Sequence, residues 1–245
     1  LIKPSKIKLC YLIMWGMYVF ITLIQGRINN WRKILLMIFP FLFYYLIGGI
    51  FEYIYRRRND YSINKIYLLS IVMIFVDQVI KLAIKFSFQL EEKIPMVEEW
   101  LYLYPVKNLY NSGLLSIFQI DIFSNLLIGI GNIIVLIMVM FFYRFYLNNN
   151  KRNLWIDSFL LFGISGVGAG IIDTFFWGYT LDYINIPLFL TFDLKDIFIN
   201  LSVSCLYVEI LVINPHDITI KDLLKGSISF FKFIGKDIKK KKFKN

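Results

Sequence analysis

The stretch GYTLDYINIPLFLTFDLKD, residues 178–196, forms a short polar break between two strongly apolar segments of the chain. Two aspartates, Asp182 and Asp196, bracket this break. Two carboxylates held where a bilayer meets water can share one proton and activate a water molecule beside a lipid-borne substrate. The stretch therefore indicates a site for acid–base chemistry at a membrane surface. The alternative is that Asp182 is an ordinary loop residue and Asp196 a charge at a helix N-terminus.

The composition of the whole chain is that of an integral membrane protein. Of the 245 residues, 58% are hydrophobic, and the mean hydropathy of +0.62 exceeds that of most soluble domains. A helix needs roughly 20 apolar residues to cross the hydrocarbon core. We therefore expect an all-α membrane protein with about six transmembrane helices, near residues 9–25, 34–55, 66–86, 122–143, 156–178 and 196–213.

The first of these segments follows Lys3, Lys6 and Lys8, an arrangement that also occurs in cleaved leaders. No small-residue cleavage pattern follows before Arg27. We interpret the segment as a retained anchor, with a cleaved leader as the alternative.

The net charge of +10 does not indicate nucleic-acid binding, because the basic residues are distributed by membrane side. Most of them fall in the loops and tail that share one side of a six-helix topology, as the positive-inside rule requires of the cytoplasmic side. Both termini are therefore expected in the cytoplasm, and Asp182 and Asp196 at the outer face of the cell membrane. The basic tail, residues 215–245, is expected either to lie on an anionic leaflet or to be a solvated, disordered end.

Residues 87–121 are too polar to span a membrane and are rich in β-branched and aromatic side chains. The run from Trp100 to Lys107 has strand character and ends near turn residues. A small extracellular β-element is therefore expected between the third and fourth helices. Elsewhere, Cys10 and Cys205 fall in predicted helices without metal-ligand spacing, so buried, unpaired thiols are expected.

Ionisable residues inside the spans are costly to bury and therefore of functional interest. Asp77 and Lys81 are four residues apart, so they share one helix face and can neutralise each other, either as a structural tie or as part of a site. Asp173 lies late in the fifth helix. Glu209, near a cytoplasmic helix end, is expected to reach the interface. Gly166 and Gly170 predict close helix packing, with a ligand groove as the alternative.

Five sequence blocks from Asp77 onward resemble, in order, those of lipoprotein signal peptidase, or signal peptidase II. Val76–Lys81 is similar to an Asp-Gln-x-x-Lys block, and the block that ends at Asp173 is similar to a glycine-rich Asp-Arg block. The stretch 178–184 resembles the segment with the first catalytic aspartate. Residues 192–196, Phe-Asp-Leu-Lys-Asp, resemble the Phe-Asn-x-Ala-Asp block with the second. The remaining block is the strand that leads to a key asparagine, either Asn108 or Asn111 of Asn111-Ser112-Gly113.

The resemblance implies a four-helix core at residues 64–214, preceded by a two-helix extension at 1–63. It implies a membrane aspartyl endopeptidase that removes signal peptides from diacylglyceryl-modified prolipoproteins without metal or cofactor. Asp182 and Asp196 would be catalytic. The supporting or substrate-binding residues would be Asn108, Asn111, Gly113, Asp77, Lys81, Gly170, Asp173 and Asp193. The expected partners are the bilayer and the prolipoprotein; we expect a monomer, although the sequence does not determine the oligomeric state.

The chain departs from the family's pattern in several places. Gly170 and Asp193 stand where asparagine is expected, and Thr174 where arginine is expected. Asp193 and Lys195 add charges of opposite sign beside the aspartate pair, and the interval from Asp182 to Asp196 is shorter than usual. These departures leave open a catalytically degenerate relative that binds lipoproteins or lipid.

A second alternative is a small transporter or channel subunit in which Asp77, Lys81 and Asp173 form a polar path. Transporters of this kind are commonly built from internal repeats and broken helices. The sequence contains no internal repeat, which argues against this alternative.

Overall fold

The computed structural model describes residues 5–26, 31–57, 62–108, 125–187, 190–215 and 220–242. Within these residues, six helices are long and apolar enough to cross a membrane. They are α1 (Lys6–Ile24), α2 (Trp31–Arg57), α3 (Ile63–Ser87), α5 (Asn125–Asn149), α6 (Leu154–Ile172) with its π-helical continuation Asp173–Trp177, and α7 (Leu194–Val208) with its π-helical continuation Glu209–Ile213. The prediction of a six-helix membrane protein is confirmed.

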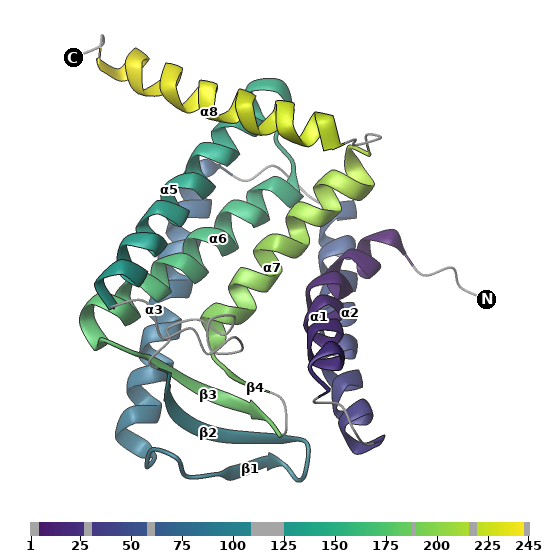
Figure 1. The fold of residues 1–245 in the computed structure, drawn as a ribbon, viewed down its shortest axis with the longest axis vertical. Helices are drawn as coiled ribbons and strands as arrows, with labels where there is room; N and C mark the ends of the chain where they lie inside the picture. Colours follow the sequence, from purple (N-terminus) through teal and green to yellow (C-terminus); the bar gives the residue numbers. More distant parts are fainter. Residues whose placement is uncertain are drawn as a thin grey trace.

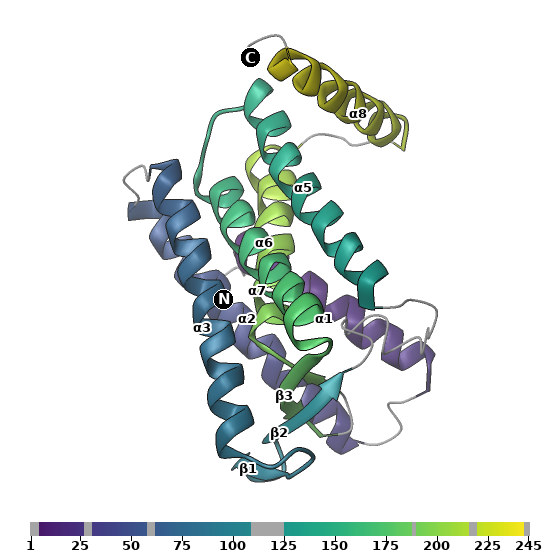
Figure 2. The ribbon, with the colours of Figure 1, turned by 90° about the vertical axis from the view of Figure 1, so that its left-hand side faces the viewer.

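Helix α6 forms the centre of the bundle and packs against α3, α5 and α7 (Figure 2). Close packing depends on its small residues. A Cβ atom at Gly166 would lie 3.0 Å from the backbone oxygen of Lys195 and 2.6 Å from Cγ1 of Ile199, both on α7. Only glycine allows the two backbones to approach so closely, and the packing interpretation of Gly166 is confirmed. The outer faces of α3 and α5 expose large apolar side chains, as lipid-facing helices do.

A four-stranded antiparallel sheet covers one end of the bundle (Figure 1). Its order is β1 (Ile94–Val97), β2 (Leu101–Asn108), β3 (Thr180–Ile186) and β4 (Leu190–Phe192). The predicted β-element at residues 100–107 is confirmed as β2. The polar break at residues 178–196 was not recognised as β-structure, yet β3 and β4 form a hairpin in it that joins α6 to α7. Asp182 pairs with Val106 of β2 in this sheet.

The described part of the basic tail is a helix, α8 (Ile220–Lys242), that crosses the opposite end of the bundle (Figure 1). It is held to α5 by an ion pair between Arg144 and Asp237, with 2.6 Å between Nη1 and Oδ2. The ring of Phe145 also contacts Phe230 and Phe233. The alternative of a disordered end is therefore wrong for these residues.

Glu209 does not reach the interface, and that expectation was wrong. Its side chain is fully buried, because three neutral donors surround its carboxylate: the hydroxyl of Tyr146, Nδ2 of Asn153 at 2.8 Å and Nδ2 of Asn214 at 2.6 Å. A buried carboxylate is tolerated when its oxygens are hydrogen-bonded in this way. Cys205 is buried and unpaired, as is Cys10.

Candidate active site

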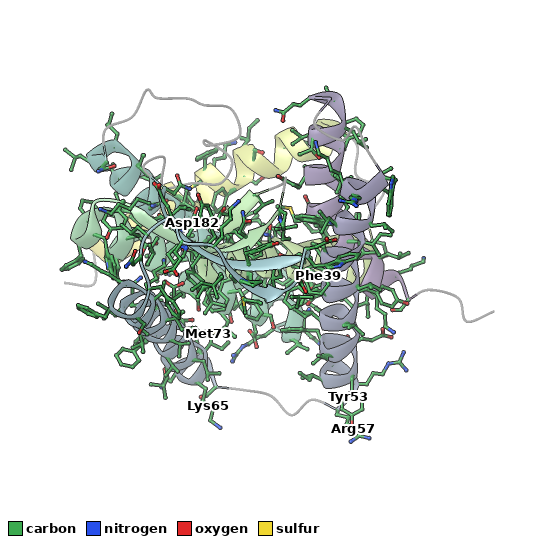
Figure 3. All side chains as sticks on the ribbon, turned by 90° about the horizontal axis from the view of Figure 1, so that it is seen from below. Phe39, Tyr53, Arg57, Lys65, Met73 and Asp182 are labelled. Atoms are coloured by element: carbon green, nitrogen blue, oxygen red, sulfur yellow. The ribbon has the colours of Figure 1, made fainter. Side chains whose placement is uncertain are left out.

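Three carboxylates meet where the sheet joins the helical bundle. Asp182 lies in the middle of β3, Asp193 immediately precedes α7, and Asp196 lies in the first turn of α7. One oxygen of each lies within 4.8 Å of one oxygen of each of the others. Figure 3 looks along the bundle from the sheet end and shows Asp182 on the same side of the view as Met73 of α3, with Phe39 of α2 on the other side.

Asp193 determines where α7 begins. Its Oδ1 accepts a hydrogen bond from the backbone amide of Asp196 at 3.1 Å, and its own amide donates to Oδ2 of Asp196 at 3.4 Å. This reciprocal capping box satisfies two amides at the helix N-terminus and places negative charge where the helix dipole favours it. The asparagine expected here could also cap a helix, so Asp193 preserves this role and fixes the carboxylate of Asp196.

A buried lysine on α3 ties three elements together. Nζ of Lys81 lies 2.9 Å from Oδ2 of Asp77, 2.6 Å from Oδ2 of Asp173 and 2.8 Å from Oδ2 of Asp193. These four side chains are at most 1% exposed. An ion network this deep requires every charge to be paired, because an uncompensated buried charge costs about 3–5 kcal/mol. A supporting buried network of Asp77, Lys81 and Asp173 was predicted, and the structure extends its ion pairs to Asp193.

Gln78 belongs to the same cluster but was missed as a site residue. Its Nε2 donates to Oδ2 of Asp77 and to Oδ1 of Asp173, each at 3.0 Å, and its Oε1 accepts from Nε1 of Trp177 at 3.0 Å. The signal was present in the sequence, because Gln78 is the second residue of the block that starts at Asp77.

Lys195 supplies a second buried cation to the cluster. Its Nζ lies 2.8 Å from Oδ2 of Asp193, 3.7 Å from Oδ2 of Asp173 and 3.9 Å from Oδ1 of Asp196. A Cβ atom at Gly170 would lie 3.4 Å from Nδ2 of Asn132 on α5 and 3.9 Å from Cδ of Lys195. Gly170 therefore lies between the amide of Asn132 and the stem of Lys195.

Thr174, at the position where the resemblance predicts arginine, carries no charge, and its hydroxyl donates to the backbone oxygen of Gly170 at 2.8 Å. Lys81 already pairs with Asp173 at 2.6 Å, and Lys195 on the neighbouring helix adds a second cation at 3.7 Å. A positive charge thus lies beside Asp173 although the neighbouring Thr174 is neutral.

Asp182 has one hydrogen-bonded and one free oxygen within the described residues. Nδ2 of Asn108, at the end of β2, donates to its Oδ2 at 2.8 Å, whereas the buried Oδ1 has no hydrogen-bond partner there. Asn111 and Gly113 lie outside the described residues. Asn108 is thus the candidate asparagine that the structure brings to the carboxylates.

The surroundings separate the protonation behaviour of Asp182 and Asp193. Burial raises the pKa of Asp182 well above its ordinary value; Lys195 opposes this shift, and the neighbouring carboxylates of Asp196 and Asp193 add to it. Burial also disfavours ionisation of Asp193, but the ammonium groups of Lys195 and Lys81 outweigh it and lower the pKa of Asp193. Asp193 is thus the ionised counter-charge for the lysines, and Asp182 is the carboxyl group suited to carry a proton.

The oxygens of Asp182, Asp193 and Asp196 also have the spacing of a possible metal site. Oδ2 of Asp193 already accepts two ammonium groups, and Oδ1 accepts the amide of Asp196. A divalent cation bound here would meet the charges of Lys81 and Lys195 at close range. The donor set therefore suits carboxylate chemistry better than metal binding.

The fold and the site together define a multi-pass membrane protein with an acidic cluster at one end of its helical bundle. Residues 69–212, more than half of the chain, match the family described as Signal peptidase (SPase) II. The chain therefore belongs to the signal peptidase II family, which confirms the resemblance inferred from the five sequence blocks. Helices α1 and α2 precede the matched residues.

The comparisons with individual proteins agree with this membership. The chain is 26% identical over 145 residues to the lipoprotein signal peptidase of Moorella thermoacetica, a match that covers 59% of this chain and 91% of that protein. The fold is similar to two solved structures described as a bacterial membrane enzyme. The first has a TM-score of 0.54 at 18% identity, covering 65% of this chain and 96% of that one. The second has a TM-score of 0.54 at 19% identity, covering 63% and 97%.

Proposed function

We propose that this protein is an aspartic-type membrane endopeptidase that removes signal peptides from diacylglyceryl-modified prolipoproteins. The observation that carries the proposal is the approach of the Asp182 and Asp196 oxygens to within 4.8 Å, from a strand and a helix that meet at the end of the bundle. Membership of the signal peptidase II family and the similarity to a lipoprotein signal peptidase support the same activity.

The proposed reaction divides acid and base work between the two aspartates. Asp196, held by the amide of Asp193, accepts a proton from water as the water oxygen bonds to the scissile carbonyl carbon. Asp182, whose pKa is raised chiefly by burial, donates its proton to the carbonyl oxygen. The tetrahedral intermediate then breaks its carbon–nitrogen bond: the proton held by Asp196 passes to the leaving amine, and Asp182 takes a proton back from a hydroxyl of the intermediate as the carbonyl re-forms. Asn108 orients Asp182 through its hydrogen bond.

The remaining candidate residues act as positioning residues in this proposal. The ion pairs of Asp77, Lys81, Asp173 and Asp193 hold the N-terminus of α7 against α3 and the end of α6. Residues 64–214 constitute the catalytic core, 1–63 a two-helix extension and 215–245 a basic tail.

The proposal also assigns the membrane orientation. The distribution of lysine and arginine residues favours both termini in the cytoplasm and the sheet with the aspartate pair at the outer face of the cell membrane. Helix α8 then lies on the cytoplasmic leaflet, where its lysines attract anionic lipid headgroups.

The test is complementation of a bacterium depleted of its own lipoprotein signal peptidase, scored by the uncleaved prolipoprotein. The wild-type chain is expected to restore cleavage. Asp182→Asn and Asp196→Asn are each expected to reduce it by about 100-fold or more, as loss of a general acid or base does. Asp237→Asn, on α8 at the far end of the bundle, is the matched control and should retain full activity. Failure of the wild-type chain to restore cleavage would instead favour a binding protein without catalysis, and full cleavage by both active-site variants would refute the roles of Asp182 and Asp196.

A further inference from the structure

Helices α1 and α2 precede the family-matched residues but are built into the same bundle, beside α7 (Figure 1). Tyr11 of α1 is fully buried, and its hydroxyl lies 3.2 Å from Sγ of Cys205 on α7. The hydroxyl of Tyr44 on α2 accepts a hydrogen bond from Nδ2 of Asn200, also on α7, at 3.1 Å. Because Asn200 lies one helical turn after Asp196, the extension contacts the catalytic helix close to the site.

A cavity of about 400 Å³ lies between the extension, the sheet and the first turns of α7. Its walls include Met14 and Trp15 from α1, Phe39 and Phe43 from α2, and Ile184 from β3. Small-molecule sites in proteins commonly measure about 300–1,000 Å³. The cavity is therefore large enough for a ligand, and α1 and α2 provide seven of its 17 lining residues.

The apolar cavity has a polar edge at the candidate active site. Asp196, Asn200 and Thr191 contribute to its lining. The side chain of Asp196 is 23% exposed, whereas Asp182 is only 3% exposed. The cavity thus leads from an apolar region beside the extension to the more accessible of the two proposed catalytic carboxylates.

These features suit a hydrocarbon chain that is attached to a polar group. An extended peptide in the same space would leave its backbone amides and carbonyls without partners against the apolar walls. A hydrocarbon chain has no such groups to satisfy. The two membrane-spanning helices that form the wall also place the cavity beside the hydrocarbon region of the bilayer.

We propose that this cavity holds one acyl chain of the diacylglyceryl group of the substrate, and that α1 and α2 thereby determine which chain lengths are processed. This proposal rests on the proposed function, and it gives the N-terminal extension a role in substrate selection. The polar edge would lie beside the glyceryl linkage, while the chain extends toward Met14 and Phe43.

The test compares two methionine substitutions on the same helix. Met14→Trp fills the cavity, whereas Met17→Trp, three residues later, replaces a half-exposed side chain that does not line it. The full-length protein in bicelles is assayed with one prolipoprotein peptide that carries diacylglyceryl chains of 8, 12 or 16 carbons. Met14→Trp is expected to lower kcat/KM for the longest chain about tenfold relative to the shortest, a typical effect of overpacking. Met17→Trp should keep the wild-type profile. An equal loss for all three lengths, or the same profile in both variants, would overturn the proposal.

A photocrosslinking measurement on the wild-type protein keeps the proposal testable without any variant. The probe is the same lipidated peptide with a diazirine in one acyl chain, and the adducts are located by mass spectrometry. Labelling of Met14, Phe39 or Phe43 supports the proposal, whereas labelling confined to other residues overturns it. Equal labelling by phosphatidylglycerol with the same diazirine chain also overturns it, because the occupant is then bulk lipid. Failure of the wild-type protein to cleave any peptide refutes the proposed function, while the crosslinks still decide the occupancy of the cavity.

Discussion

Replacing Asp193 and Lys195, singly and together, measures how strongly the two unusual charges beside the aspartate pair depend on each other. Asp193→Asn leaves Lys195 with its next carboxylates at 3.7 and 3.9 Å, in place of one at 2.8 Å. Lys195→Ala leaves the fully buried Asp193 with Lys81 as its remaining cation among the described residues. Each single change therefore removes the closest partner of a buried charge, which costs about 3–5 kcal/mol in the free energy of unfolding.

The double variant Asp193→Asn with Lys195→Ala removes one negative and one positive charge together. The net charge of the cluster is unchanged, and asparagine can still cap α7. We expect the double variant to lose only about 1–2 kcal/mol, so that the coupling free energy in the double-mutant cycle is at least about 3 kcal/mol. The two substitutions also produce the Phe-Asn-x-Ala-Asp pattern that the block resembles.

The assay is reversible unfolding in bicelles or mild detergent for all four proteins of the cycle, with prolipoprotein cleavage measured in parallel. The matched control is the pair Arg144→Ala and Asp237→Asn, a partly exposed ion pair whose coupling should not exceed about 1 kcal/mol. If the losses of the two single variants simply add to that of the double variant within about 0.5 kcal/mol, the proposed compensation is refuted.

Two further predictions concern the acid and the helix packing. Asn108→Ala removes a hydrogen bond that lowers the pKa of Asp182, so the alkaline limb of the pH–rate profile should move to higher pH. A profile that does not move, or that moves to lower pH, contradicts the assignment of Asp182 as the acid. The raised pKa of Asp182 also makes the free energy of unfolding depend on pH. Because the folded state binds this proton more tightly than the unfolded state does, Asp182 stabilises the fold at low pH, and this contribution is lost as the pH rises toward its raised pKa. Gly166→Ala should destabilise the protein by about 1–3 kcal/mol, because its Cβ would lie 2.6 Å from Ile199. The control Gly131→Ala, whose Cβ would meet no atom within 4 Å, should be neutral or stabilising by up to about 1 kcal/mol. Equal unfolding free energies for the two variants would refute the packing argument.

The sequence predicted those features that depend on local pattern. The length of the apolar segments predicted the six helices, and the β-branched and aromatic residues predicted the strand at 100–107. The i, i+4 spacing gave the ion pair of Asp77 and Lys81, which is present at 2.9 Å. In each case the physical cause lies within one or two helical turns or one strand of the chain.

The features that were missed depend on contacts between distant segments. Residues 178–196 were interpreted as a polar break because a strand such as β3 is recognisable only beside its partner β2, more than seventy positions earlier. Lys195 was expected to perturb the aspartate pair, but its shared contact with Lys81 on Oδ2 of Asp193 depends on how α3 and α7 meet. The burial of Glu209 became interpretable only when its partners in other segments were known.

The hairpin of β3 and β4 has a consequence for how the interval between the two proposed catalytic residues can vary among relatives. Asp182 is positioned by its pairing with Val106 of β2, and Asp196 by the cap of α7, whereas the pairs of β3 with β4 run from Ile184 and Phe192 to Ile186 and Leu190, between these two anchors. Insertions or deletions beyond Ile184 change the length of the segment between Asp182 and Asp196 without moving either aspartate. A short interval between Asp182 and Asp196 is thus compatible with an intact carboxylate pair.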